Sequence, residues 1–111
     1  MHLRKLSAFV VLFGFSGIVP ALADSSCRLA PDASPPTRRV TTIEFRNFGT
    51  SPLRVDWVDF DGNLKNYGEV RAGGTFTQST FVSHVWQLTA MTGECKKRVV
   101  ARRSADKVQV N

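Results

Sequence analysis

The sequence contains few residues that could support metal or redox chemistry. Its 111 residues include two cysteines, Cys27 and Cys95, and two histidines, His2 and His84. The cysteines do not form a Cys-x-x-Cys pair, and His2 lies in the leader described below. Two cysteines and one remaining histidine cannot complete a tetrahedral zinc set. We therefore expect neither a metal site nor a cofactor.

The motifs of common enzyme classes are also missing. No Gly-rich phosphate loop opens a helix, because Gly73 and Gly74 lie in a turn between expected strands, and no Gly-x-Ser-x-Gly elbow occurs. Ser79, Ser83 and His84 could supply a nucleophile and a base, but adjacency of a serine and a histidine in sequence is not catalytic geometry. We expect a protein that is not an enzyme and rank a small hydrolase last.

The sequence has no apolar run long enough for a membrane span. Leu6–Val19 falls short of the roughly 20 residues that a spanning helix needs. The run follows Arg4 and Lys5 and is followed by Pro20 and the small-x-small sequence Ala21-Leu22-Ala23. This pattern predicts a secretory signal peptide over residues 1–23, cleaved after Ala23, and hence a periplasmic or secreted protein.

Removal of this leader leaves residues 24–111, enough for one small domain. The formal net charge falls from +6 to +4, because Arg4 and Lys5 are lost. Small exported domains often depend on a covalent link, and disulfides persist outside the cytoplasm. We therefore expect Cys27 and Cys95 to form a disulfide.

The mature chain is expected to contain an arm and one domain. Residues 24–39 hold Pro31, Pro35 and Pro36 among serines and threonines, which indicates a linker or extended arm. From Val40 onward, short β-rich runs alternate with turn residues, and no amphipathic helix or internal repeat is found. The pattern predicts an all-β domain over residues 40–111, a small β-sandwich or barrel. The expected strands are Val40–Asn47, Leu53–Phe60, Asn66–Arg71, Thr75–Val82, His84–Ala90, Cys95–Arg103 and Lys107–Val110.

Alternation within these runs predicts which side chains share a face. In the second run, Leu53, Val55 and Trp57 should lie on one face, with Val58 and Phe60 on the other. His84 and Trp86 are two residues apart and should also share a face. The group Trp57, Tyr67, Thr80, His84 and Trp86 is a candidate site, although on the residues alone we favour a core role for both tryptophans.

The C-terminal part of the chain is basic. Two interpretations are open: binding of nucleic acid or an anionic surface, and a solvated edge strand whose charges discourage aggregation. Export argues against nucleic acid, so we favour the edge strand, and contact with a membrane surface has no support in the sequence. The residues concerned are Lys96, Lys97, Arg98, Arg102, Arg103 and Lys107.

Several motifs follow one another in an order typical of one family. The order is Trp57-Val58-Asp59-Phe60-Asp61-Gly62, then Tyr67, then Gly73, then His84-Val85-Trp86. Upstream, Ile43-Glu44-Phe45-Arg46-Asn47 matches an apolar-x-Phe-x-Asn first strand. Over about Thr42–Ala90 the chain resembles the β domain of the von Hippel–Lindau tumour suppressor family.

The resemblance implies a β-sandwich of about seven strands and a site that captures 4-hydroxyproline in an extended peptide. Trp57 and Trp86 would be the apolar walls around the ring, and Tyr67 would bond the peptide backbone. Thr80, which stands where the family has serine, and His84 would meet the hydroxyl group. Ser79 replaces a histidine that contacts the peptide in the family.

The family's eukaryotic protein continues into a helical domain that recruits elongin and a cullin ligase. Because this chain stops at Asn111, we expect no elongin or cullin partner. The sequence thus predicts an exported module, not an enzyme, that binds a peptide or protein at a hydroxyproline or proline. The alternative is a structural or envelope-associated protein, with core aromatics and a basic tail that contacts anionic partners.

Overall fold

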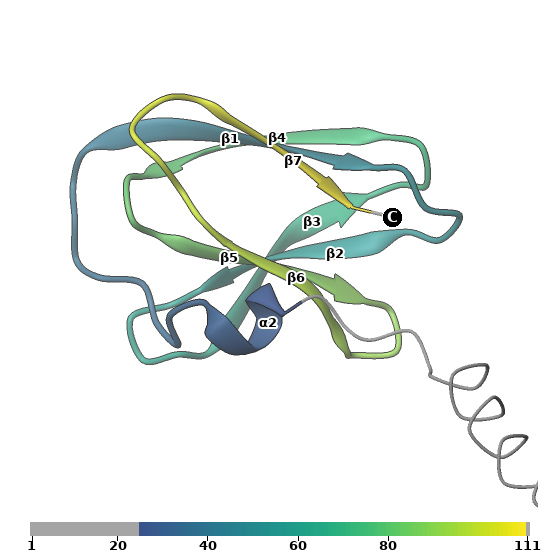
Figure 1. Ribbon diagram of the computed structural model, residues 1–111, viewed down its shortest axis with the longest axis horizontal. Coiled ribbons are helices and arrows are strands. Elements are labelled where there is room, and N and C mark those ends of the chain that lie inside the picture. Colours follow the sequence, from purple (N-terminus) through teal and green to yellow (C-terminus); the bar gives the residue numbers. More distant parts are fainter. Residues whose placement is uncertain (1–24, 111) are drawn as a thin grey trace, which may run out of the picture.

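The protein is a two-layered β-sandwich with almost no helix (Figure 1). The computed structural model describes residues 25–110, so the expected signal peptide lies outside the described residues. Within this range no helix is long and apolar enough to cross a membrane. The elements are the helical turn α2 (Ser26–Leu29) and the strands β1 (Val40–Asn47), β2 (Leu53–Val58), β3 (Leu64–Val70), β4 (Thr75–Phe81), β5 (Val85–Ala90), β6 (Cys95–Val100) and β7 (Asp106–Val110).

The seven strands form two sheets, which confirms the predicted all-β sandwich. The smaller sheet has the order β4-β1-β7 and the larger has the order β3-β2-β5-β6. All neighbours are antiparallel except β1 and β7, which pair in parallel. This topology leaves β3 and β4 as edge strands of different sheets.

The core between the sheets follows from the alternation of apolar residues. Ile43 and Phe45 of β1 are fully buried and face Val55 of β2 and Leu88 of β5. Val108 of β7, the edge strand next to β1, is part of the same core. The alternate positions of β1 carry polar side chains, as a half-buried strand requires.

The outer face of the larger sheet is also covered, because the arm folds back across it. Every residue of β5 up to Thr89 is buried, which one core alone would not produce in an alternating strand. The Ser34 hydroxyl donates to the carbonyl of Val58 and accepts from the backbone N–H of Val85 at 2.8 Å. The arm therefore bridges the ends of β2 and β5.

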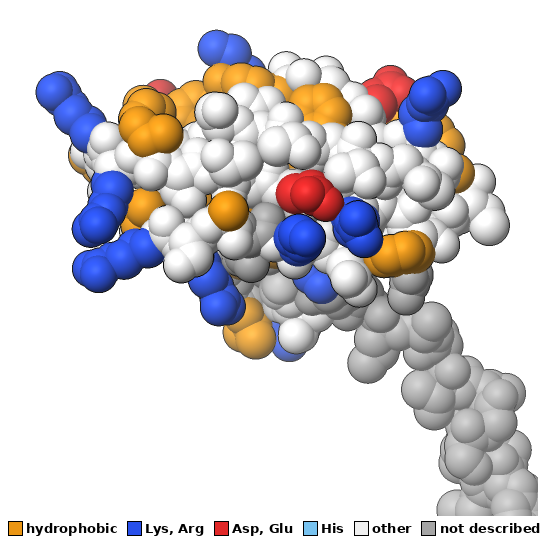
Figure 2. Space-filling view, turned by 90° about the horizontal axis from the view of Figure 1, so that it is seen from above, with side chains coloured by type: hydrophobic (Ala, Val, Ile, Leu, Met, Phe, Trp, Pro, Cys, Tyr) orange, Lys and Arg blue, Asp and Glu red, His pale blue; other side chains and the backbone are white. Residues whose placement is uncertain are grey.

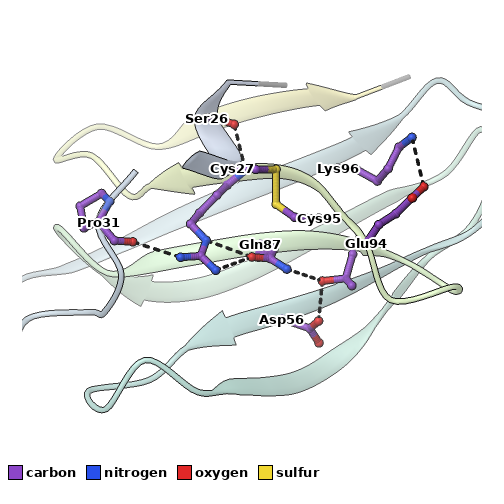
Figure 3. The surroundings of a disulfide bond; sticks show 10 residues. Ser26, Cys27, Pro31, Asp56, Gln87, Glu94, Cys95 and Lys96 are labelled. Atoms are coloured by element: carbon purple, nitrogen blue, oxygen red, sulfur yellow. Dashed lines mark hydrogen bonds and ion pairs between the residues drawn. A yellow bond between two sulfur atoms is a disulfide. The ribbon is translucent and has the colours of Figure 1, made fainter. Parts of the chain in front are cut away.

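Under the arm lies a polar cluster (Figure 3). Asp56 is fully buried, and its carboxylate accepts hydrogen bonds from Thr89 at 2.7 Å and Asn66 at 3.0 Å. Arg98 donates from two guanidinium nitrogens to Gln87 Oε1, at 2.9 and 2.6 Å. Arg98 is therefore not part of a fully solvated basic edge, because it holds the sheet beneath the arm.

The predicted disulfide between Cys27 and Cys95 is present. It joins α2 to the start of β6, and the backbone N–H of Arg98 donates to Ser26 Oγ beside it. The arm was expected to lack regular structure, yet residues Ser26–Leu29 form one helical turn. This turn packs on β6, so the crosslink fixes the arm to the face that it covers.

One predicted side-chain placement is wrong. Phe60 was assigned to the face opposite Trp57, but β2 ends at Val58 and Phe60 packs edge-on against Trp57 with ring centroids 5.1 Å apart. The Asp59 carboxylate accepts hydrogen bonds from the backbone N–H groups of Asp61 and Asn63, which turns the chain. A residue beyond the strand end no longer follows the alternation.

We expect removal of the disulfide to destabilise the fold strongly. The bond spans 68 positions, and in the chain-entropy model such a crosslink contributes about 4 kcal/mol. The double variant Cys27→Ser/Cys95→Ser should lose free energy of unfolding of this order, measured by urea denaturation at pH 7. If the free energy of unfolding falls by less than about 1 kcal/mol, with an unchanged denaturant slope, the disulfide does not stabilise the fold as expected.

Candidate functional site

A pocket of about 170 Å³ opens at one end of the sandwich. Two of the strands that line it, β3 and β4, are edge strands, and the turn between β4 and β5 adds His84. All six residues predicted to form a site line this single pocket, together with two phenylalanines that the prediction had not included. The lining residues are Trp57, Phe60, Tyr67, Ser79, Thr80, Phe81, His84 and Trp86.

A β-bulge lies at Tyr67. Val55 pairs with Gly68 and Asp56 pairs with Asn66, so Tyr67 is the extra residue of β3. Gly68 has a φ of +149°, and a Cβ atom there would lie 2.7 Å from the ring of Phe76. Only glycine fits this close approach. The bulge turns the chain so that Tyr67 lies against Trp57 and Trp86.

The aromatic rings form the walls of the pocket. Trp57 stacks on His84, with centroids 5.6 Å apart and an interplanar angle of 23°. Tyr67 lies edge-on to Trp86 at 5.0 Å and is 42% exposed. Trp86 is 2% exposed and belongs to the core cluster, whereas Trp57 is only partly buried. The core role therefore holds for Trp86, which also lines the pocket, but does not fully describe Trp57.

Both indole N–H groups are used to hold polar side chains in the pocket. Trp57 Nε1 donates to His84 Nδ1 at 3.1 Å, and Trp86 Nε1 donates to Thr80 Oγ1 at 2.8 Å. The Thr80 oxygen thus acts as an acceptor, which leaves its hydroxyl proton for another acceptor. The walls of the pocket and its polar groups are therefore positioned by the same two side chains.

His84 is buried, and burial disfavours its charged form. Burial lowers the pKa of His84 below the usual 6.5, and a hydrogen bond from the imidazole to the backbone carbonyl of Pro35 opposes this shift in part. Because Nδ1 accepts from Trp57, the neutral ring carries its proton on Nε2. Nε2 is buried and makes no hydrogen bond of good geometry among residues 25–110.

The serines considered as nucleophiles are not bonded to His84. Its Nδ1 accepts from Trp57, and its Nε2 makes no hydrogen bond of good geometry within the described part of the chain. Ser79 is exposed at the pocket rim, and Ser83 lies in the tight turn before β5, where its φ is +77°. This arrangement lacks the serine–histidine hydrogen bond on which a hydrolase depends.

Phe60 and Phe81 are the pocket residues that sequence reasoning missed. Phe60 is 55% exposed and Phe81 is 37% exposed, and both approach His84 at centroid distances below 6 Å. Phe60 lies within the motif that begins at Trp57, and this position could have identified it as a pocket residue. No sequence motif indicated Phe81 as a pocket residue, because only the turn after β4 brings it beside His84.

A larger pocket of about 350 Å³ lies among the loops at the opposite end of the sandwich. It contains neither an aromatic residue nor a histidine, and Lys96 and Glu94 are its charged residues. Across the described residues, no group of three or more cysteine, histidine or acidic side chains is arranged to hold a metal ion. The smaller pocket is therefore the better candidate for specific recognition.

The fold is a β-sandwich domain with an aromatic pocket at one end. The family model of the VHL beta domain matches residues 33–97, which is more than half of the chain. The chain belongs to the VHL beta domain family. A search of curated protein sequences found no match to it. The matched segment ends within β6, so β7 lies beyond it.

The lowered pKa of His84 predicts a pH-dependent stability. Above pH 6.5, the ring is neutral in both states and the full free energy of unfolding is present. As the pH falls below 6.5, the unfolded chain takes up the proton first, so the free energy of unfolding should fall until the folded pKa is reached.

Urea denaturation between pH 5.5 and 7.5 measures this slope. A His84→Asn variant, compared over the same range, should lose the part of the slope that lies near pH 6.5. Identical slopes in the two proteins, or stability that rises as the pH falls, would contradict the buried neutral state of His84.

Proposed function

We propose that this protein is a binding module that captures the ring of a hydroxyproline residue in an extended peptide or protein segment. The supporting observation is the pocket in which Trp57, Tyr67 and Trp86 surround the polar pair Thr80 and His84. In the absence of a hydroxylated ligand, a proline ring would bind between the same apolar walls with lower affinity.

The size of the pocket favours one small ring. Pockets that enclose drug-sized ligands measure roughly 300 to 1,000 Å³, whereas this one is about 170 Å³. The pyrrolidine ring of proline is compact and apolar on both faces, so it suits a space between aromatic rings. A cofactor or a large flat ligand would not fit.

The polar pair supports selectivity for a hydroxyl group. Thr80 retains a proton to donate, and His84 Nδ1 is an acceptor at the pocket. A hydroxyl can accept from Thr80 and donate to His84, whereas a carbonyl can only accept and an ammonium can only donate. The His84 lone pair is shared with Trp57, so the ligand hydroxyl must compete with the indole N–H for it.

The remaining parts of the ligand would lie along the edge of the sandwich. β4 is an edge strand with unpaired backbone groups on one side, and an extended peptide can pair with such an edge. Tyr67 and Ser79 are exposed at the rim and offer hydroxyl groups to the peptide backbone. Ser79 is shorter than the histidine that the family has there, so it would contact less of the flanking peptide.

The module would act outside the cytoplasm and without catalysis. The disulfide agrees with an oxidising compartment, and the leader predicted at residues 1–23 supports export. The ligand would then be an extracellular or envelope protein segment. A purely structural role is the second candidate, and the burial of Trp86 is the observation that favours it.

Binding should depend on the ligand hydroxyl and on Thr80. By titration calorimetry, a peptide with a central hydroxyproline should bind at least about fivefold more tightly than the matched proline peptide, because a hydrogen bond in a buried site contributes about 1 kcal/mol or more. Thr80→Val should remove this difference. Thr77→Val, an exposed site on the same strand, is the matched control and should keep it.

A second variant tests the pocket walls. Trp57→Ala should weaken binding of both peptides, since it removes a wall that is only partly buried and is outside the main core. Far-ultraviolet circular dichroism and thermal melting verify that the variant is folded. Equal affinity for the two peptides in wild type would reject hydroxyproline selectivity, and undiminished binding by the folded Trp57→Ala protein would reject the site.

A further inference from the structure

The end of the sandwich that carries the pocket also carries a group of arginines. Arg38 and Arg39 immediately precede β1, and Arg102 and Arg103 follow β6. All four are exposed. Figure 2 shows Lys and Arg side chains gathered at one end of the molecule, the end that carries the loop between β6 and β7 in Figure 1. We call these four residues the arginine group.

Backbone hydrogen bonds place this group beside the pocket rim. The N–H of Val82 donates to the carbonyl of Arg39 at 2.7 Å, and Thr41 Oγ1 donates to the carbonyl of Arg103 at 3.3 Å. Ala101, which precedes Arg102, exchanges two backbone hydrogen bonds with Ser83 and His84. The two arginine segments therefore flank the chain that runs from Phe81 to His84.

At this end Asp106, the first residue of β7, follows Arg103 by three positions, whereas the other acidic residues belong to different segments. Asp59 and Asp61 lie in the turn between β2 and β3, and Asp32 lies in the arm next to Gly62 of that turn. The Asp59 carboxylate already accepts two backbone hydrogen bonds. The pocket thus has an acidic turn beyond Trp57 and, beyond Phe81, a border of four arginines and one aspartate with a net positive charge.

Three members of the arginine group are not paired with an acidic side chain among the residues that the structure describes. In the described part of the chain, no ion pair within 4.0 Å joins Arg38, Arg39 or Arg103 to an acidic side chain. Like charges held together repel one another, and such a patch raises the local concentration of anionic partners. The group also lies in loops, so it does not protect the edge of a strand.

We propose that the ligand segment carries acidic residues on one flank of the captured ring, and that the arginine group binds them. This inference rests on the proposed function. An extended peptide advances about 3.3 Å per residue, so residues a few positions from the ring would pass over Phe81 and reach this group. The acidic turn on the opposite side of the pocket would disfavour the reverse orientation. Charge would therefore set the direction in which the ligand lies.

Three hydroxyproline peptides test this proposal: one with neutral flanks, one with aspartates two to four positions before the ring, and one with aspartates two to four positions after it. One acidic peptide, and not both, should bind about three- to tenfold more tightly than the neutral peptide at 50 mM salt. This advantage should shrink at 300 mM salt, because exposed charges are screened.

Two double variants assign the effect to its residues. Arg39→Gln/Arg103→Gln should bind the favoured acidic peptide only as well as the neutral one, with neutral-peptide affinity unchanged. Arg71→Gln/Lys96→Gln removes the same charge from the opposite end of the sandwich and should behave as wild type.

The outcomes separate this inference from the proposed function. If the neutral peptide binds and neither acidic flank improves its affinity, the proposal fails while the pocket stands. If no hydroxyproline peptide binds, both fail. Binding of vesicles rich in anionic lipid that is lost in Arg39→Gln/Arg103→Gln, without any acidic-peptide advantage, would assign the arginine group to a membrane surface and overturn the proposal.

Discussion

The structure depends on the burial of β5 from both sides. One face of the strand packs in the core, and the arm covers the other face. Ser34 connects the arm to Val58 and Val85, which are register partners at the ends of β2 and β5. Trp57 and Trp86 are the next register pair along these strands. The hydrogen bonds of Ser34 therefore also help to fix the two tryptophans of the pocket.

The pocket combines side chains that are costly to place together in a fold. Buried polar groups destabilise a protein unless they are bonded, and Thr80 and His84 are each held by an indole N–H. The Nε2 atom of His84 makes no hydrogen bond of good geometry in the described residues. A buried imidazole with an unused polar atom beside an aromatic wall fits the proposed recognition of a small hydroxyl group.

Much of the fold could be predicted because alternation in short strands reports burial directly, and β1 begins and ends at the predicted residues. The family motifs likewise identified six side chains that the fold brings into one pocket. Phe60 was misplaced because a side-chain capped turn follows β2. The proximity of Arg39 to Arg103 could not be predicted either, because it depends on β7 pairing in parallel with β1 and on the path of the loop between β6 and β7.

We propose that a hydroxyproline ring enters between Trp57 and Trp86. The chain contains two tryptophans, so its proton–nitrogen correlation spectrum should show two indole resonances. Titration with a hydroxyproline peptide should shift the Trp57 indole resonance most, since the ligand hydroxyl competes for His84 Nδ1, and the Trp86 resonance as well. Saturable shifts confined to residues at the opposite end of the sandwich, with both indole resonances unchanged, would contradict the account.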